Sequence, residues 1–429
     1  MSPSLSQFSA DASSSLPGPP WLRARRRAAF ERFEAADLPT EAEEVWRYSR
    51  IDQLDLDAYS PVLADGGAEP GLPSALGPIV EAVGDRAGLV VVRNGRVTHA
   101  ELEPALERRG VVAGSLDATA GSEDLVGSSL LASDPFVELN TAFMADVAVV
   151  RVPEGVAVER PIVVVNWVDA VAGAVFPQLV VHTGPAAQVS VFEYVASPHD
   201  LIALTDPVVE LHAGEASNLS YVGVQELGRG VWQLGHQASR VARDATLSSL
   251  LVALGGDYAR VSTDSRLEGQ GSTSRLRAAY FGDGRQMHDF RTLQDHDAPK
   301  TMSDLLFKGA VEEQSHAVYS GLIRIRKGAA GTNAFQTNRN LVLSNGAHAD
   351  SVPNLEIEEN DVRCSHASAV GPIDEDHRYY LEARGLPPHV AERLVVLGFF
   401  EEVVEDVPIP GLRQPLRRSV AAKLEGPQA

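Results

Sequence analysis

The sequence predicts a mainly β protein in which a long β-rich centre is flanked by helical regions at both ends. From about residue 147 to 343, short β-rich segments follow one another, with strand starts mostly about 10 to 20 residues apart. Glycines separate many segments, and no clear helical periodicity interrupts them, which argues against an α/β sheet. Asn-Gly turns, which antiparallel hairpins favour, are scarce here. Although no strict repeat is visible, the spacing favours a β-helix, with a sandwich or a jelly roll as alternatives.

We expect four regions along the chain. Residues 1–20 are rich in Ser and Pro and lack periodicity, which predicts a disordered arm. A mixed, largely helical region follows over residues 21–133, and the β-helix core occupies residues 134–372. Residues 373–429 form a C-terminal helical region.

The N-terminal region should begin with a helix at Pro19-Pro20, because proline is tolerated in a first helical turn. Thr40 and Glu43 match a capping box, which predicts a second, short helix that carries Trp46. Asn94-Gly95 between two apolar runs predicts a hairpin with a type I′ turn.

Two further helical stretches flank the β region. Asp134-Pro135 predicts the start of a helix that runs to about residue 144. After the β region, Asp374 can cap a helix that ends at Gly385. Pro387-Pro388 opens the next helix, and residues 407–429 read as a basic, solvated end.

The composition of the chain argues against several classes of function. Of the 429 residues, 44% are hydrophobic and 22% are charged, as in ordinary soluble proteins. A net charge of −21 argues against a general binder of nucleic acid or anionic membranes. The single cysteine excludes internal disulfides and fits a reducing compartment. Since residues 1–20 lack an apolar signal core and no apolar run reaches ~18 residues, we expect a cytoplasmic protein.

Several enzyme signatures are absent from the sequence. There is no GxxxxGK[ST], so we do not expect this chain to bind ATP through a P-loop. HExxH, GxSxG and the dinucleotide-binding GxGxxG are also missing. We therefore expect a non-catalytic chain.

The only cysteine lies two positions before a histidine. Leu355 and Ile357 alternate with glutamates, as in a half-buried strand. If the extended chain continues, Cys364 and His366 project from the same face, about 7 Å apart. A thiolate and an imidazole suit zinc or an iron–sulfur species, but two ligands cannot complete a site that normally takes four. Either other ligands come from elsewhere, or the pair is half of a shared site; a buried cysteine beside a satisfied histidine is the simpler alternative.

A second polar cluster falls within 23 positions. It could form an acid–base site, but we favour a polar network at the turns of a solenoid. Its members are Gln286, Asp289, Arg291, His296, Lys300, Thr301, Ser303 and Lys308.

A set of motifs resembles the SufB/SufD family of bacterial iron–sulfur cluster assembly. The likeness is densest over residues 289–404. In chain order, the matching residues are Glu43-Glu44-Val45-Trp46-Arg47-Tyr48, Phe136-Val137-Glu138-Leu139-Asn140, the run 289–296, Pro299, Thr301, Ser303, Phe307-Lys308-Gly309, the run 336–344, Pro353-Asn354-Leu355-Glu356-Ile357, Cys364-Ser365-His366 and the run 379–385.

Within that family the chain resembles the SufD branch. SufB-like chains carry Glu-His-Glu at the Cys-Ser-His position and a separate upstream cysteine, whereas Cys364 is the only cysteine here. The chain departs from the common SufD pattern at Ala367, where a glycine usually follows the histidine.

The resemblance implies a right-handed parallel β-helix with helical regions at both ends. It implies a scaffold subunit that pairs with SufB through the β-helix ends and receives the ATPase SufC on its C-terminal helices. It also implies a transient iron–sulfur cluster shared with SufB, with His366 as the ligand and Cys364 beside it. The partner-binding residues expected in the C-terminal region are Asp374, Tyr379, Tyr380, Leu381, Arg384 and Leu394.

Two other functions remain as alternatives. A stand-alone carbohydrate-active enzyme on a β-helix would need paired carboxylates and aromatic sugar platforms, yet aromatics make up only 6% of the chain. A purely structural spacer would leave Cys364 and His366 without a role.

Overall fold

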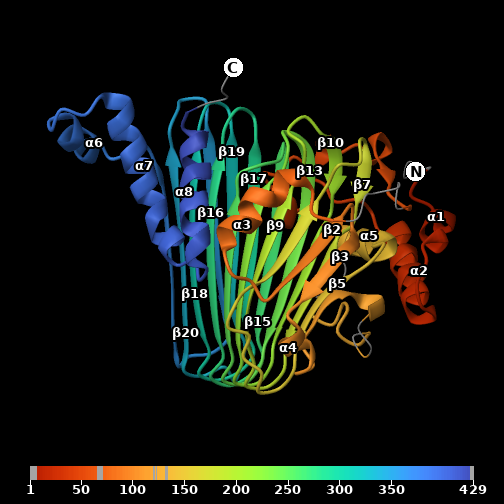
Figure 1. The fold of residues 1–429 in the computed structure, drawn as a ribbon. Helices are drawn as coiled ribbons and strands as arrows, with labels where there is room; N and C mark the ends of the chain where they lie inside the picture. The colour runs from red at the N-terminus through yellow and green to blue at the C-terminus, as the bar shows by residue number, and fades with distance from the viewer. Residues whose placement is uncertain (1–6, 65–70, 119–120, 122, 131–133, 426–429) are drawn as a thin grey trace.

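The computed structural model describes residues 7–64, 71–118, 121, 123–130 and 134–425, and its centre is a parallel β-solenoid (Figure 1). Within these residues, two long sheets run side by side, one of 12 strands and one of 10. Successive core strands alternate between the sheets, so each coil adds one strand to both. The β-helix prediction is therefore confirmed.

The first sheet ends at β21 and the second at β22. In chain order, the first contains β1 (Ser60–Pro61), β4 (Val112–Ser115), β5 (Ala148–Val152), β7 (Gly173–Val175), β8 (Gln178–Thr183), β10 (Ile202–Thr205), β11 (Val208–Ala213), β13 (Gly230–Val241), β15 (Tyr258–Leu267), β17 (Met287–His296), β19 (His316–Ile325) and β21 (His348–Ile357). The second contains β2 (Gly88–Arg93), β3 (Arg96–Leu102), β6 (Ile162–Trp167), β9 (Gln188–Ala196), β12 (Asn218–Glu226), β14 (Thr246–Ala253), β16 (Thr273–Gly282), β18 (Met302–Val311), β20 (Thr332–Val342) and β22 (Val362–Gly371).

Helices lie at both ends and over the outer faces of the sheets. The described α-helices are α1 (Ala10–Ser15), α2 (Pro20–Ala35), α3 (Gly77–Val83), α4 (Pro104–Glu107), α5 (Pro135–Phe143), α6 (Glu375–Glu382), α7 (Pro388–Glu405) and α8 (Pro410–Lys423). Short 3₁₀ turns are η1 (Glu44–Trp46), η2 (Ile51–Gln53), η3 (Leu56–Ala58), η4 (Ser74–Leu76) and η5 (Leu116–Ala118). Among the described helices, none is both long and apolar enough to cross a lipid bilayer.

Three apolar layers hold the solenoid together. Side chains alternate between the faces of each strand, so one face of each sheet fills the interior and the other meets a covering segment. In the early coils, the interior is a column of aliphatic side chains such as Val164 and Val191. The outer face of the second sheet packs against α3, α7 and α8, where Phe281 stacks on Phe400. The outer face of the first sheet packs against the N-terminal segment.

A buried charge network fastens this N-terminal segment. The Asp289 carboxylate accepts hydrogen bonds from Arg260 Nη1 at 2.8 Å and from Tyr258 Oη at 2.8 Å. Arg260 also donates to the carbonyl of Val45 at 2.9 Å, and its guanidinium lies 3.7 Å from the Trp46 ring centre. Burial raises the pKa of Asp289, but the neighbouring guanidinium groups outweigh it and hold that pKa below its usual value.

Three local predictions were wrong. Residues 1–20 are not a disordered arm where the structure describes them, because Ala10–Ser15 form α1 and Phe8 packs edge-on against Phe143, 5.4 Å between ring centres. Residues 1–6 lie outside the described part of the chain. After Thr40, only the short η1 forms, although Glu43 Oε1 accepts from the Thr40 amide at 3.0 Å as a capping box requires. The basic end forms α8, whose Leu412 is buried in the layer over the second sheet.

Other local predictions are confirmed. Asn94 and Gly95 have φ of 48° and 78°, the left-handed pair of a type I′ turn, and they join antiparallel β2 and β3. Asp134 accepts from the Phe136 amide at the start of α5, and Asp374 accepts from the Asp376 amide at the start of α6.

We predict that Arg260→Leu lowers the free energy of unfolding by about 3–5 kcal/mol, because it leaves the Asp289 charge buried without its main partner. Denaturant unfolding of the purified chain measures this. Since the folded-state pKa of Asp289 lies below its unfolded value, the contribution of the network is present above pH ~4. It is lost as pH falls through the folded-state pKa.

The matched control is Arg324→Leu, which breaks the half-exposed pair between Arg324 and Glu356 on β19 and β21. It should cost no more than about 1 kcal/mol. Equal losses in the two variants would contradict a special role for the buried network.

Candidate functional site

The last coil of the solenoid leaves both sheets open. Among the described strands, β22 pairs with β20 alone and β21 pairs with β19 alone. Their outer edges therefore present backbone N–H and C=O groups that a further strand could pair with. Apolar side chains accompany these edges, because Leu355, Ile357 and Val370 are 38%, 44% and 45% exposed.

Cys364 and His366 lie on β22 and share the face that points into the solenoid. Their neighbours in register on β20 are Ala334 and Gln336, both buried in the interior. The strand that carries Leu355 does not continue to His366 as expected, because β21 ends at Ile357 and a turn over 358–361 leads into β22. The same-face prediction holds nonetheless, since both residues lie on one strand, two positions apart.

The thiol and the imidazole have different surroundings. Cys364 is half-buried and packs beside Ile323, Ile325 and Ala334. Burial raises the pKa of the Cys364 thiol, so the thiol is protonated at neutral pH in the isolated chain. His366 is exposed at the open end. The Cys364 thiol therefore lies against apolar side chains, whereas the His366 imidazole faces solvent.

A chain of hydrogen bonds leads from this open end into the interior. Ser368 Oγ donates to Ser351 Oγ at 2.7 Å, and Ser351 Oγ donates to Asn338 Oδ1 at 2.7 Å. Asn338 Nδ2 donates to Tyr280 Oη at 2.9 Å, and that hydroxyl donates to Asn340 Oδ1 at 2.8 Å. The last coils are thus polar inside, where the early coils are aliphatic.

Gln336 is the buried neighbour of His366 in register, and its amide has no hydrogen-bond partner among the described residues. Its side chain is only 1% exposed. Buried amides are nearly always paired, because leaving one unpaired costs about 1–3 kcal/mol. An unpaired amide beside His366 is what a polar ligand at this position would satisfy.

The donor set on this chain is incomplete. Among the described residues, only one group of three His, Cys, Asp or Glu side chains brings ligand atoms together, and it contains neither Cys364 nor His366. That group is His316, His348 and Asp350, on β19 and β21. Sequence analysis missed it because 32 positions separate the two histidines, and only the register of adjacent coils pairs them.

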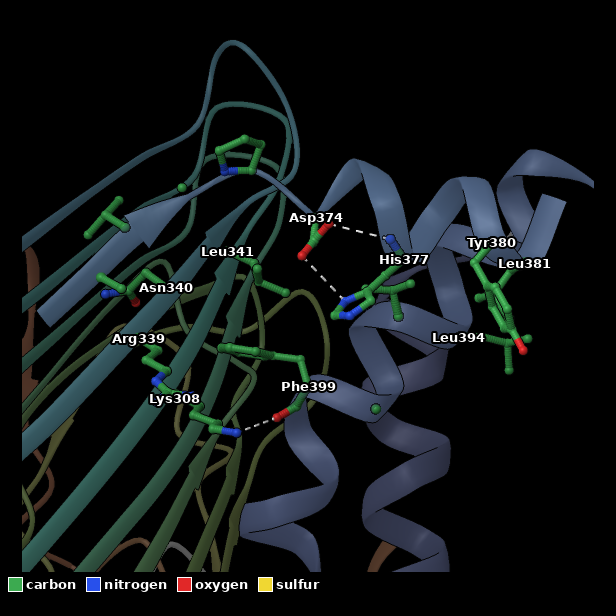
Figure 2. A pocket seen from close by; sticks show the side chains of 16 residues that line it. Lys308, Arg339, Asn340, Leu341, Asp374, His377, Tyr380, Leu381, Leu394 and Phe399 are labelled. Atoms are coloured by element: carbon green, nitrogen blue, oxygen red, sulfur yellow. Dashed lines mark hydrogen bonds and ion pairs between the residues drawn. The ribbon is translucent and has the colours of Figure 1, made fainter. Parts of the chain in front are cut away.

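A groove of about 920 Å³ lies between the last strands of the second sheet and helices α6 and α7 (Figure 2). Asp374, Tyr380, Leu381 and Leu394, four of the expected partner-binding residues, line it. The other two lie outside the lining: Tyr379 is 71% exposed, and the Arg384 guanidinium lies 4.7 Å from the Tyr380 ring centre.

Helix α6 buries none of its residues against the rest of the chain. It extends, together with the start of α7, beyond the solenoid, opposite the end where α1 and α2 lie (Figure 1). The groove and α6 thus present aromatic and aliphatic side chains to solvent at the same end as the open coil.

The polar cluster between residues 286 and 308 does not form one site. Asp289 and Arg291 belong to the network under the N-terminal segment. His296 lies inside the solenoid between the hydroxyls of Thr301 and Ser303, at 2.7 and 2.9 Å, and burial lowers its pKa to about 4.

Its other members lie elsewhere. Lys308 Nζ donates to the Phe399 carbonyl at 2.9 Å and fixes α7 (Figure 2). Gln286 Oε1 accepts from Lys423 of α8 at 2.5 Å, and Lys300 occupies an exposed left-handed turn with φ 56°. The predicted polar network at the turns therefore holds only for Gln286, Lys300 and Thr301, whereas the other side chains lie on strands.

Comparisons with known proteins agree with this architecture. The family described as "SUF system FeS cluster assembly, SufBD core domain" matches residues 166–399, and "SufBD protein N-terminal region" matches residues 12–164. An iron–sulfur cluster assembly SufBD family protein of Mycobacterium tuberculosis is 39% identical over 51% of this chain. The chain spans only 57% of the length of that relative.

Two SufD proteins match over most of the chain. The iron–sulfur cluster assembly protein SufD of Bacillus subtilis is 26% identical over 95% of this chain and 95% of its own length. SufD of Escherichia coli is 26% identical over 91% of this chain and 90% of its own length.

We predict that Cys364 of the isolated native chain reacts with a disulfide reagent at neutral pH more slowly than in the unfolded chain, because burial raises the pKa of the thiol and so lowers the thiolate fraction. Since this is the only cysteine, the release of chromophore reports on it alone. The same chain in guanidinium is the matched control. Equal rates in the two states would contradict the burial of this thiol.

Proposed function

This chain belongs to the SufBD family of iron–sulfur cluster assembly proteins, and from that premise we propose that it is a non-catalytic scaffold subunit. It pairs with a SufB-type chain and a SufC-type ATPase, and it contributes to a site where a nascent cluster is built. The cluster is the cargo of this site, held transiently and passed on. The alternative of a stand-alone carbohydrate-active enzyme is set aside, because the matched relatives carry names of assembly proteins.

The observation that carries the proposal is an incomplete donor set at an open solenoid end. Cys364 and His366 face inward on β22, and among the described strands no further coil covers them. Fewer than four protein ligands cannot hold a cluster stably, so a second chain has to complete the site. A scaffold that shares its site with a partner has this property.

The same coil offers a way to recruit that partner. Free edges of β21 and β22 can continue the sheets through backbone hydrogen bonds with strands of another chain. The exposed side chains of Leu355, Ile357 and Val370 would then be buried. Strand addition at this edge places the partner's residues directly over Cys364 and His366.

His366 and Cys364 differ in how readily they can bind iron. A neutral imidazole ligates iron directly through a ring nitrogen, so His366 can serve as a ligand from this chain. Cys364 has to lose its proton before it binds iron, and its raised pKa opposes this until a metal ion is close. We therefore assign His366 as the principal ligand from this chain and Cys364 as a secondary one.

The ATPase docks on α6 and the start of α7 in this proposal. Tyr379 and Tyr380 are 71% and 57% exposed, and Leu394 of α7 is 45% exposed beside them. An apolar and aromatic surface on a helix that packs little against its own chain is typical of a docking site. This surface lies next to the open coil, so an ATPase docked there would sit beside the shared site.

We predict that His366→Ala leaves assembly with the SufB-type and SufC-type chains intact and lowers cluster formation at least about tenfold. Loss of outer partners of a ligand alone costs about 10- to 100-fold in metal affinity, and loss of a ligand should cost no less. The measurements are visible absorption and the iron and sulfide content of the purified complex. Cys364→Ser should have an equal or smaller effect.

His199→Ala, which removes an exposed imidazole from a distant turn, is the matched control and should behave as wild type. Full cluster assembly by the doubly substituted Cys364→Ala/His366→Ala chain would show that the cluster-building site does not lie on β22.

We predict that Tyr380→Ala combined with Leu394→Asp weakens binding of the SufC-type ATPase at least about 30-fold. Truncating a central aromatic anchor alone commonly costs about 2 kcal/mol, and a buried charge adds to the loss. Calorimetry with the purified ATPase measures the affinity. Phe335→Ala, an exposed aromatic on β20 outside the groove, is the control, and unchanged ATPase binding by the double variant would place the dock elsewhere.

A further inference from the structure

Three side chains with metal-ligand chemistry meet on the outer face of the first sheet, at its last two strands. Parallel pairing of β19 and β21 sets His316 beside His348, and Asp350 follows His348 on the same face of β21. One ligand atom from each of the three lies within 4.8 Å of the others. Cys364 and His366, by contrast, lie on the second sheet and face inward.

The Asp350 carboxylate already joins the two rings. Its Oδ2 lies 2.7 Å from His316 Nε2, and its Oδ1 lies 3.3 Å from His348 Nε2. The two ring centres are 5.2 Å apart, with the planes tilted by 46°. A tetrahedral metal with bonds of about 2.0–2.1 Å separates neighbouring ligand atoms by about 3.3 Å. The two carboxylate-to-imidazole distances of 2.7 and 3.3 Å lie at or below this value, and all three ligand atoms lie within 4.8 Å of one another, so rotation of the side chains can bring them around one ion.

The three ligand residues lie on hydrogen-bonded strands, and their side chains are accessible to solvent. The amides of His316 and His348 donate to the carbonyls of Gln286 and Ser315 at 2.9 and 3.1 Å, which fixes both strands in the solenoid ladder. The side chains of His316, His348 and Asp350 are 29%, 68% and 22% exposed. An ion from solution can therefore reach ligands whose main chain is already rigid.

The site lies where the cover of this sheet ends. In register before His316 come Met287 and Tyr258, both buried in the layer under the N-terminal segment. His316 and His348 continue the same column but no longer carry that cover. Polar ligands thus replace apolar side chains in the part of the column that meets solvent.

We propose that His316, His348 and Asp350 bind one divalent transition-metal ion of the Zn²⁺ or Fe²⁺ class, with water in the remaining positions. Two imidazole nitrogens and one carboxylate oxygen favour these ions over Ca²⁺ and Mg²⁺, which prefer oxygen ligands alone. The ion takes the place of the hydrogen bonds to Asp350, and each imidazole then carries its proton on Nδ1 while Nε2 binds the metal. The inference stands independently of the proposed scaffold function, because none of its three ligands belongs to that site.

The test is metal titration of the full chain, purified without a polyhistidine tag and treated with chelator. Co²⁺ serves as the spectroscopic probe and Zn²⁺ as the competitor in calorimetry. We expect saturable binding of one Co²⁺ per chain, a visible absorption band, displacement by Zn²⁺, and a higher melting temperature with metal. His348→Ala and Asp350→Ala should each weaken binding at least tenfold and abolish the metal-dependent rise in melting temperature.

The Cys364→Ala/His366→Ala chain is the matched control, since it removes the other thiol and imidazole and should bind Co²⁺ as wild type does. Two outcomes would overturn the proposal: no saturable Co²⁺ binding by the wild-type chain, or binding that survives in both His348→Ala and Asp350→Ala. In the second case, loss of binding in the control would assign the ion to Cys364 and His366 instead. Because His348 is exposed, its replacement should leave the fold intact, and Asp350→Ala provides a second, independent reading.

Discussion

Everything in this structure depends on the in-register hydrogen bonding of parallel strands, which builds a solenoid but can never close it. Each coil satisfies the edges of the coil before it and exposes two new edges of its own. At the N-terminal end, the antiparallel strands β3 and β4 interrupt the stacking, and helical segments pack around them. At the other end, β21 and β22 stop with their edges open. This asymmetry, rather than any one side chain, decides where a partner can join.

The composition of the interior changes along the same axis. Aliphatic columns such as Val164 and Val191 need only volume, whereas Asn338 and Tyr280 near the open end need hydrogen-bond partners from neighbouring coils. Stacking makes this possible, because equivalent positions of successive coils lie only about 4.8 Å apart. It also makes an unpaired group such as the Gln336 amide conspicuous, because its neighbours in register on both sides, Leu305 and His366, give it no hydrogen-bond partner among the described residues.

Much of the fold could be predicted from the sequence, because strand signals are local. The alternation of side chains along a strand predicted that Cys364 and His366 share one face. The Asn94-Gly95 pair predicted the turn between β2 and β3. Neither prediction needed the tertiary structure. The features that could not be predicted depend on contacts between residues that are distant in the sequence. Helix α1 is short and rich in serine, and it forms where Phe8 docks on Phe143. The pairing of His316 with His348 follows from coil length, which varies too much for a repeat to be read from the sequence.

The last coils are also where this solenoid presents side chains to a ligand. Inside the stack, each inward side chain is covered by the coils on both sides and packed at high density, which leaves a ligand from solution no access to it. On the outer face of the first sheet, the N-terminal segment covers Tyr258 and Met287, whereas His316 and His348, which follow in register, are partly exposed. Inward donors on β22 and outward donors on β19 and β21 are therefore consequences of the same truncation. In the two proposals, metal binding and partner binding both fall where the chain's own stacking stops.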